Sequence, residues 1–169
     1  MGDIGLEANI GREKYSRRSF FLEHEPPSAV VWYPPNWTAA GDQQMDHAIA
    51  DQIYADFAKY LTAGDLQGLL GLYEQDAVFV RGPGDHVSGR AELSAVLQGF
   101  LDTKGQISFK VRHAVQNGDI ALLSNEYTLQ GTDPEGKPFT MTGKTSEVIR
   151  RQSDGRWLFI IDHPSGAED

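Results

Sequence analysis

Residues 60–80 read YLTAGDLQGLLGLYEQDAVFV, and this stretch contains the signals that decide the fold. Gly64 can adopt the left-handed conformation that ends a helix, and Asp65 can cap the helix that follows. The stretch therefore predicts a helix that ends at Gly64, a second helix over residues 66–74 and a strand over residues 77–81. A Gly-Pro-Gly run breaks the chain directly after that strand.

Helical periodicity continues on both sides of this stretch. Upstream, from Asp46 onward, apolar residues recur at helical spacing at Ile49, Ile53 and Phe57. Downstream, a single apolar stripe predicts a third helix over residues 90–101. The stripe consists of Leu93, Val96, Leu97, Phe100 and Leu101.

After Gly105 the apolar pattern changes to a period of two, which is typical of strands. Alternation and turn dipeptides predict four strands joined by short loops, over residues 107–115, 119–130, 137–152 and 156–163. The order of elements predicts an α+β fold. Three N-terminal helices are expected to pack on one face of a curved antiparallel sheet.

Composition excludes several classes of function. The 169 residues are enough for one domain, and their net charge of −9 argues against nucleic acid and anionic membranes as partners. The sequence contains no cysteine, so disulfides, thiolate metal sites and cysteine nucleophiles are excluded. No apolar run approaches the roughly 20 residues that span a bilayer.

Residues 1–45 differ from the rest and are expected to form an extended N-terminal arm, with the folded domain over 46–166. Two Pro-Pro pairs in this region cannot donate backbone hydrogen bonds, which argues against a central strand. The arm is expected to pack on the domain or on a partner subunit. The alternative is a flexible leader segment. The run SRRSFFL at 16–22 resembles a twin-arginine export signal, but the sequence EHEPP follows at once instead of an apolar stretch. We therefore expect a cytoplasmic protein.

Turn lengths predict which residues face each other across the sheet. We take Asp154-Gly155 and Asn117-Gly118 as two-residue turns and residues 133–136 as a four-residue loop. One row then crosses four strands and consists of His113, Leu122, Glu147 and Asp162. Because neighbouring strands lie ~4.8 Å apart, the two carboxyls would be adjacent.

If this face is buried, the adjacent carboxyls cannot both ionise easily, and the pKa of one of them rises. An acid and a base side by side suit proton-transfer chemistry near neutral pH. Two alternatives remain. A one-residue slip or a bulge would place the row on the other face of the sheet, or the two carboxyls could lie at the solvated end of the sheet. The same face is predicted to carry Phe109, Val111, Ser124, Glu126, Ile149 and Ile160, a mixture that suits a small-molecule pocket.

Two parts of the sequence resemble a known superfamily. Residues 60–80, with a Gly-Asp pair between helices and Asp76-Ala77-Val78 at the strand entry, resemble the opening of nuclear transport factor 2-like proteins. At this point the chain looks like ketosteroid isomerases and SnoaL-like polyketide cyclases. The ending, DGRWLFIIDHPSG at 154–166, is similar to small SnoaL-like proteins and to the association domain of calcium/calmodulin-dependent kinase II. The resemblance covers about residues 46–166 and implies a cone with an internal pocket, usually in a homodimer.

Functional residues carry over from these families only in part. Where ketosteroid isomerases place a tyrosine and a general-base aspartate, this chain has Phe57 and Arg81, which argues against isomerisation by that mechanism. Tyr54 lies one helical turn away and can substitute for the tyrosine. The second acid of those isomerases falls near Glu147, and the late acid/base aspartate of the cyclases corresponds to Asp162.

The remaining candidates each have a structural alternative. Tyr54, Phe57, Tyr73 and Phe79 are expected to line the pocket, although such aromatic spacing also fits an ordinary core. Arg81 either binds an anionic group of the substrate or forms a surface salt bridge. His113 either orients Glu147 or is a satisfied core histidine. No histidines have metal-ligand spacing and no dinucleotide or phosphate motif occurs, so no metal and no cofactor are expected.

These observations support two hypotheses. The first is a cofactor-independent acid/base enzyme in which Asp162 shuttles a proton and neutral Glu147 donates a hydrogen bond. It would act as a cyclase, isomerase, dehydratase or epoxide-opening enzyme on a small apolar oxygenated molecule. The second is a non-catalytic ligand-binding or oligomerisation module, similar to the kinase association domain.

Overall fold

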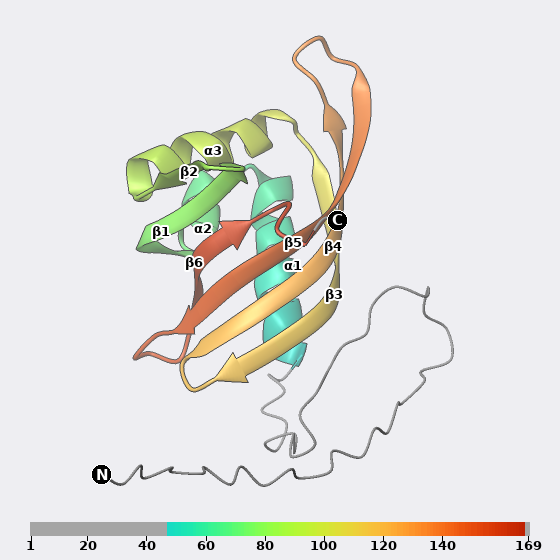
Figure 1. Cartoon of the computed structure of the whole chain (residues 1–169). Helices are drawn as coiled ribbons and strands as arrows, with labels where there is room; N and C mark the ends of the chain where they lie inside the picture. The colour runs from blue at the N-terminus through green and yellow to red at the C-terminus, as the bar shows by residue number, and fades with distance from the viewer. Residues whose placement is uncertain (1–46, 168–169) are drawn as a thin grey trace, which may run out of the picture. The chain divides into compact units, whose positions relative to one another are not determined.

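The computed structural model describes residues 47–167, so the predicted N-terminal arm lies outside the described residues. Within them the chain forms three helices and six strands (Figure 1). In chain order these are α1 (His47–Ala63), α2 (Leu66–Leu70), β1 (Tyr73–Gly82), β2 (Asp85–Ser88), α3 (Arg90–Asp102), β3 (Gln106–Asn117), β4 (Ile120–Thr132), β5 (Pro138–Arg151) and β6 (Trp157–His163).

The strands form one curved sheet in the order β2-β1-β6-β5-β4-β3. All neighbouring strands are antiparallel except β1 and β6, which are parallel. The helices cover one face, and Figure 1 shows α1 behind the strands with α3 across the β1–β2 end. The predicted α+β fold, with helices on a curved sheet, is confirmed.

The predicted helix end at Gly64 and the predicted cap at Asp65 are confirmed. Gly64 has a positive φ of 69°, and the Asp65 carboxylate accepts a hydrogen bond from Gly68 N at 2.8 Å. However, α2 ends at Leu70 rather than at residue 74, and β1 starts at Tyr73 rather than at residue 77. The reason is long-range, because the Phe159 N–H on β6 donates to the Leu72 carbonyl and draws this segment into the sheet. The short strand β2 was not predicted.

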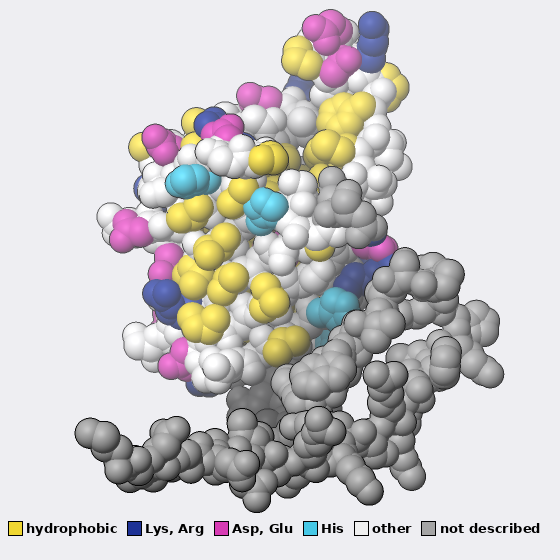
Figure 2. Space-filling view, viewed as in Figure 1, with side chains coloured by type: hydrophobic (Ala, Val, Ile, Leu, Met, Phe, Trp, Pro, Cys, Tyr) yellow, Lys and Arg dark blue, Asp and Glu magenta, His cyan; other side chains and the backbone are white. Residues whose placement is uncertain are grey.

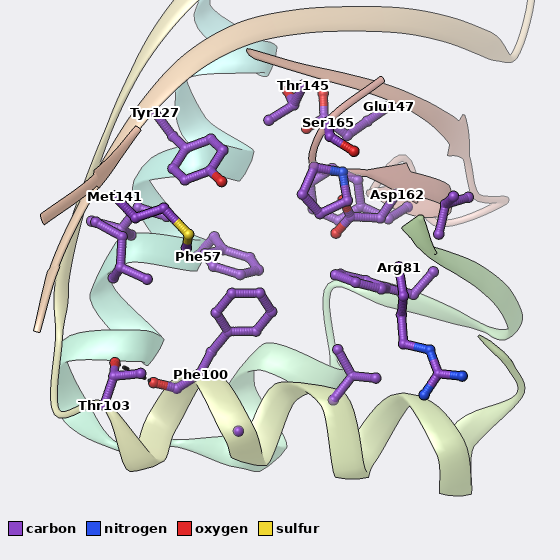
Figure 3. A pocket seen from close by; sticks show the side chains of 18 of the residues that line it. Phe57, Arg81, Phe100, Thr103, Tyr127, Met141, Thr145, Glu147, Asp162 and Ser165 are labelled. Carbon is purple, nitrogen blue, oxygen red and sulfur yellow. Dashed lines mark hydrogen bonds between the residues drawn. The ribbon is translucent and has the colours of Figure 1, made fainter. Parts of the chain in front are cut away.

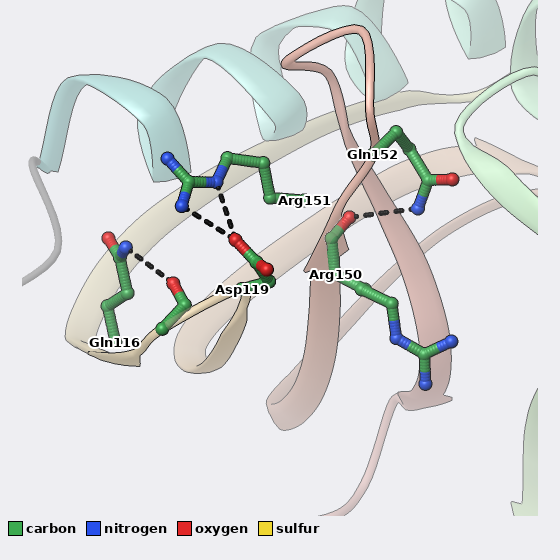
Figure 4. Close-up of polar contacts among 6 residues, drawn as sticks. Gln116, Asp119, Arg150, Arg151 and Gln152 are labelled. Atoms are coloured by element: carbon green, nitrogen blue, oxygen red, sulfur yellow. Dashed lines mark hydrogen bonds and ion pairs between the residues drawn. The ribbon is translucent and has the colours of Figure 1, made fainter.

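None of the three assumed turns is correct, because the β3–β4 turn has two residues but is shifted by one position, and the other two connections are longer than assumed. The β3–β4 turn consists of Gly118 and Asp119, since Asn117 pairs with Ile120. The Asp119 carboxylate in that turn accepts two hydrogen bonds from the Arg151 guanidinium on β5, at 2.9 and 2.6 Å (Figure 4). This anchor favours a turn centred on Gly118-Asp119 instead of Asn117-Gly118.

The β4–β5 loop is one residue longer than assumed. It contains five residues, 133–137, because Thr132 pairs with Pro138. The Asp133 carboxylate accepts from Lys137 N within this loop. The extra residue shifts the pairing of β4 with β5 by one position. As a result Leu123, and not Leu122, lies opposite Glu147.

The predicted pairing of Glu147 with Asp162 is confirmed. Near the turn the register differs by one residue from the assumed one, since Arg151 pairs with Trp157. A β-bulge at Ile160 then restores the predicted register at the carboxyls. The observed row consists of Ala114, Leu123, Glu147 and Asp162, and all four side chains are buried.

Candidate active site

A pocket of about 870 Å³ lies between the helices and the inner face of the sheet. Aromatic side chains dominate its lining, and they come from α1, α3 and five of the strands. They are Tyr54, Phe57, Phe79, Phe100, Phe109, Tyr127, Phe139 and Phe159. Figure 3 shows Glu147, Asp162, Thr145 and Ser165 together on one side, with Phe57, Phe100 and Met141 across the cavity. The pocket therefore has a wide apolar wall, with the two carboxyls together on one side.

Glu147 reaches the pocket from β5 and is only 3% exposed. The Tyr54 hydroxyl donates to Glu147 Oε2 at 2.8 Å, and Asn125 Nδ2 lies 3.3 and 3.4 Å from the two carboxyl oxygens. Burial and the neighbouring charge of Asp162 raise the pKa of Glu147 to about 8, against the opposing effect of the surrounding donors. Glu147 is therefore mainly neutral at pH 7.

Asp162 is the adjacent carboxyl on β6 and is 8% exposed. The Tyr73 hydroxyl donates to Asp162 Oδ2 at 2.5 Å. Burial raises the pKa of Asp162 to about 6, while the hydrogen bond from Tyr73 lowers it. Between these two pKa values the pair carries one proton, with a neutral acid at Glu147 and a carboxylate at Asp162.

Packing of aromatic rings fixes the two tyrosines that hold the carboxyls. The Tyr54 ring stacks on Phe109 with centroids 4.8 Å apart, and the Tyr73 ring packs on Phe159 at 5.0 Å. Burial and the adjacent carboxyls raise the pKa of each tyrosine far above its ordinary value, so both remain hydrogen-bond donors. Each tyrosine comes from a different segment, Tyr54 from α1 and Tyr73 from the start of β1.

The structure brings six of the twelve predicted site residues to the pocket lining, namely Tyr54, Phe57, Phe79, Arg81, Glu147 and Asp162. Arg81 is half exposed and forms an ion pair with Asp85 at 2.6 Å. Tyr73 lies behind Asp162 rather than on the lining. Ile149 is a core residue, and Ile160 is the bulged residue of β6.

Three predicted residues lie away from the pocket because of the register error. His113 is exposed and pairs with Ser124 across the β3–β4 ladder. Glu126 forms an ion pair with Arg112 on β3. Since successive residues of β4 alternate in direction, the inward positions are Leu123, Asn125 and Tyr127, so Ser124 and Glu126 face away.

Sequence reasoning missed two buried polar residues beside Glu147. Asn125 and Thr145 are both buried, and they lie directly opposite each other on β4 and β5. Alternation on β5 places Thr145 on the same face as Glu147, two residues away. That signal was present in the sequence, whereas Asn125 required the true length of the 133–137 loop.

Two further properties of residues 47–167 bear on function. No group of three or more histidine, aspartate or glutamate side chains in this range has the arrangement of a metal site. None of its helices is long and apolar enough to cross a membrane.

The fold and site together define a class of protein, a cone-like α+β domain of the nuclear transport factor 2-like type with a buried acid pair in its pocket. Residues 54–160 match the family model of the SnoaL-like domain. The chain therefore belongs to the SnoaL-like domain family, as its resemblance indicated. Comparison with curated proteins finds no match.

Solved structures share the fold at low sequence identity. A proposed calcium/calmodulin-dependent protein kinase II association domain from Xanthomonas campestris is 22% identical with a TM-score of 0.61, and the match covers 83% of this chain and 99% of that chain. A ketosteroid isomerase-like protein from Erwinia carotovora atroseptica is 18% identical, with a TM-score of 0.60 and coverage of 72% and 96%. A proposed dehydratase of the NTF2-like family from Streptomyces avermitilis is 19% identical, with a TM-score of 0.59 and coverage of 73% and 97%.

Proposed function

We propose that this protein is a cofactor-independent acid/base enzyme that acts on a small, apolar, oxygenated molecule in the cone pocket. One observation carries the proposal: two buried carboxyls, Glu147 and Asp162, face each other on adjacent strands and both open to an apolar cavity. Burying an acid pair costs stability unless it is compensated. Such a cost is typical of sites that perform proton transfer.

In the proposed reaction, the Asp162 carboxylate removes a proton from the carbon next to a carbonyl group. Tyr73 binds Oδ2 of Asp162, which leaves Oδ1 to receive that proton. Neutral Glu147 donates a hydrogen bond to the carbonyl oxygen as negative charge develops there. The resulting enolate takes the proton back at another carbon, expels a β-substituent or attacks a second carbonyl. Isomerisation, dehydration and aldol-type cyclisation thus share this first step.

Exchange of the α-protons of a ketone into D2O tests the first step directly. We expect the wild-type protein to accelerate this exchange for 2-tetralone, an apolar bicyclic ketone, as followed by proton NMR. Asp162→Asn removes the base and is expected to lower the catalysed rate by roughly 10²–10⁴-fold. Asp76→Asn removes the same charge at an exposed position of β1 and serves as the control. An Asp162→Asn protein that is folded and as active as wild type contradicts the mechanism.

A second candidate function is a non-catalytic assembly module, and one observation favours it. An apolar row crosses five strands on the outer face of the sheet, consisting of Val115, Leu122, Val148, Ile161 and Val78. Val115, Leu122 and Ile161 are 58%, 49% and 40% exposed. Figure 2 shows hydrophobic side chains gathered over this side of the sheet. A contiguous exposed apolar surface is typical of a protein interface.

A further inference from the structure

The two carboxyls of the site differ in the length of the hydrogen bond that each accepts from a tyrosine. The Tyr73 hydroxyl donates to Asp162 Oδ2 at 2.5 Å, whereas the Tyr54 hydroxyl donates to Glu147 Oε2 at 2.8 Å. A hydroxyl typically lies roughly 2.5–2.7 Å from an ionised carboxylate oxygen and about 2.7–2.8 Å from a neutral oxygen. The two distances therefore favour a negative charge on Asp162 and a proton on Glu147.

Asp162 depends on one hydrogen-bond donor, and Glu147 does not. Among the described residues, Tyr73 is the only side chain that donates to Asp162. Glu147 has other hydrogen-bonding neighbours besides its tyrosine, namely Asn125 and Thr145. Removing the tyrosine hydroxyl therefore leaves Asp162 without a side-chain donor, whereas Glu147 keeps others.

The fold fixes Tyr73 behind Asp162. The backbone of Tyr73 pairs with Phe159 on β6, and the Phe159 N–H donates to the adjacent Leu72 carbonyl at 2.8 Å. The Tyr73 ring packs on the Phe159 ring with centroids 5.0 Å apart, and the residue is only 2% exposed. Tyr73 does not line the pocket, so its hydroxyl does not meet a substrate. Any effect of Tyr73 on the reaction must therefore pass through Asp162.

Few other charged or titratable groups face the acid pair. Tyr54 approaches it from α1 and Tyr73 from the start of β1. Arg81 of β1 lines the pocket but forms an ion pair with Asp85, and Glu92 of α3 accepts from a backbone N–H. No lysine or histidine of the described residues lines the pocket. The tyrosines are thus the groups that make the two carboxyls unequal.

We propose that Tyr73 is a positioning residue that makes Asp162, rather than Glu147, the base of the acid pair. By binding Oδ2, Tyr73 stabilises the carboxylate and keeps the pair's shared proton on Glu147. Without this hydroxyl, the proton moves toward Asp162 and the base is lost in part of the working pH range. This inference rests on the proposed function for the reaction, and it adds what decides which carboxyl accepts the substrate proton.

The proposal predicts a shift in one limb of the pH profile. The pair carries one proton between the pKa of Asp162, about 6, and the pKa of Glu147, about 8. The hydrogen bond from Tyr73 lowers the pKa of Asp162, so Tyr73→Phe raises it. We expect the acidic limb of proton exchange to move up by about one pH unit in this variant. The exchange rate then falls about fivefold at pH 6 and about twofold at pH 7.

Two measurements on the full chain test this shift. Proton NMR follows exchange of the α-protons of 2-tetralone from pH 5 to 9, after subtraction of the uncatalysed rate. Carbon-13 NMR titrates the two carboxyls, which are assigned with Asp162→Asn and Glu147→Gln. In Tyr73→Phe, the lower apparent pKa of the pair is expected to rise together with the acidic limb.

Two further tyrosine variants serve as comparisons. Tyr54 lowers the pKa of Glu147, so Tyr54→Phe is expected to move the basic limb up and to leave the acidic limb in place. Tyr60→Phe removes a hydroxyl from a half-buried position of α1 outside the pocket lining, and it is expected to change neither limb. A different response to each variant distinguishes positioning from a general loss of packing.

Three outcomes overturn the proposal. A folded Tyr73→Phe protein with the acidic limb of wild type shows that Tyr73 does not set the base. A fall in rate that is equal at every pH shows that its hydroxyl has only a structural role. If Tyr73→Phe does not fold, the Tyr73 hydroxyl proton of wild type is followed by proton NMR from pH 5 to 7. A resonance that does not respond as Asp162 is protonated then overturns the proposal.

The carbon-13 titration separates this proposal from the proposed enzyme activity, because it needs no substrate. If wild type shows no exchange but the lower pKa of the pair rises in Tyr73→Phe, the proposed chemistry fails and the role of Tyr73 on Asp162 stands. If wild type shows exchange and neither the limb nor the pKa moves in Tyr73→Phe, the role of Tyr73 fails and the chemistry stands.

Discussion

At the scale of single residues, the site depends on two carboxyls that the fold keeps buried and adjacent, although burial and mutual repulsion disfavour their charged forms. Each carboxyl is buried, each accepts a hydrogen bond from a buried tyrosine, and the pKa of each is raised. A carboxyl whose pKa is raised on folding takes up a proton between its unfolded and folded pKa values, so it favours the folded state most at low pH and less as the pH rises. The same groups therefore couple the chemistry of the pocket to the stability of the protein.

Glu147→Gln tests this coupling. The pKa of Glu147 is raised from 4.5 to about 8 in the folded state. Between these values the folded wild type holds a proton that the unfolded chain has lost, so its stability falls as the pH rises, by at most about 1.4 kcal/mol per pH unit. Glutamine can keep the hydrogen bond from Tyr54 and has no charge to bury. We expect Glu147→Gln to match wild type near pH 5 and to be more stable by about 2 kcal/mol or more at pH 8.

Urea unfolding of both proteins at pH 5, 6.5 and 8 measures this difference. Glu135→Gln, at an exposed position in the 133–137 loop, is the matched control and is expected to leave the pH dependence unchanged. A stability difference between Glu147→Gln and wild type that does not vary with pH would show that the Glu147 carboxyl is ionised throughout.

At the scale of elements, a β-bulge and a tight connection between α3 and β3 position the strands that carry the site. The bulge at Ile160 restores the pairing of Glu147 with Asp162 after the β5–β6 turn has shifted it. Gly105 lies in the short connection between α3 and β3, where the chain passes close to the backbone of β4. A Cβ on Gly105 would lie 2.8 Å from the Gln130 carbonyl oxygen, which is closer than real Cβ contacts.

Gly105→Ala is therefore expected to destabilise the protein by about 1–3 kcal/mol, because the backbone of β4 cannot move aside easily. Gly99→Ala is the opposite case, since a Cβ there meets nothing within 4 Å and Gly99 lies inside α3. Alanine at that position is expected to stabilise the helix by roughly 0.5–1 kcal/mol. Urea unfolding measures both changes, and a Gly105→Ala protein as stable as wild type would show that the junction has room for a side chain.

At the scale of the whole molecule, the inner and outer faces of the sheet have different roles. The inner face carries the pocket, and the outer face carries the exposed apolar row from Val115 to Val78. We propose that a second copy of the chain covers this row in a homodimer, because a symmetric dimer places the same apolar surface on both subunits. The dimer is compatible with either candidate function, since the pocket lies on the other face.

Leu122→Lys tests the dimer. Leu122 is 49% exposed in the middle of the row, so a lysine at this position remains solvated in a monomer. In the dimer, the two lysines of the two subunits would be buried at the interface without a partner charge. We expect wild type to have the mass of two chains in light scattering and Leu122→Lys to have the mass of one. Gln67→Lys adds the same charge on α2, in the helical layer, and is expected to remain dimeric. A wild-type protein that is monomeric at micromolar concentrations excludes this interface.

Features that depend on neighbouring residues could be predicted from the amino-acid sequence. Gly64 and Asp65 set the boundary between α1 and α2, and the change from helical to alternating periodicity set the α+β order. It also placed Glu147 opposite Asp162, because one short turn separates their strands and the bulge offsets the error in that turn.

Features that depend on distant strands could not be predicted in this way, because they follow from how the folded sheet packs. The length of the 133–137 loop sets which face of β4 turns inward, whereas the Arg151–Asp119 hydrogen bonds accompany a shift of the β3–β4 turn that leaves this face unchanged. A shift of one residue in that loop exchanges every inward side chain of β4 for an outward one, which turned Ser124 and Glu126 away from the pocket and turned Asn125 toward Glu147. Loop lengths and bulges depend on how the whole sheet packs, and a local sequence pattern does not contain that information.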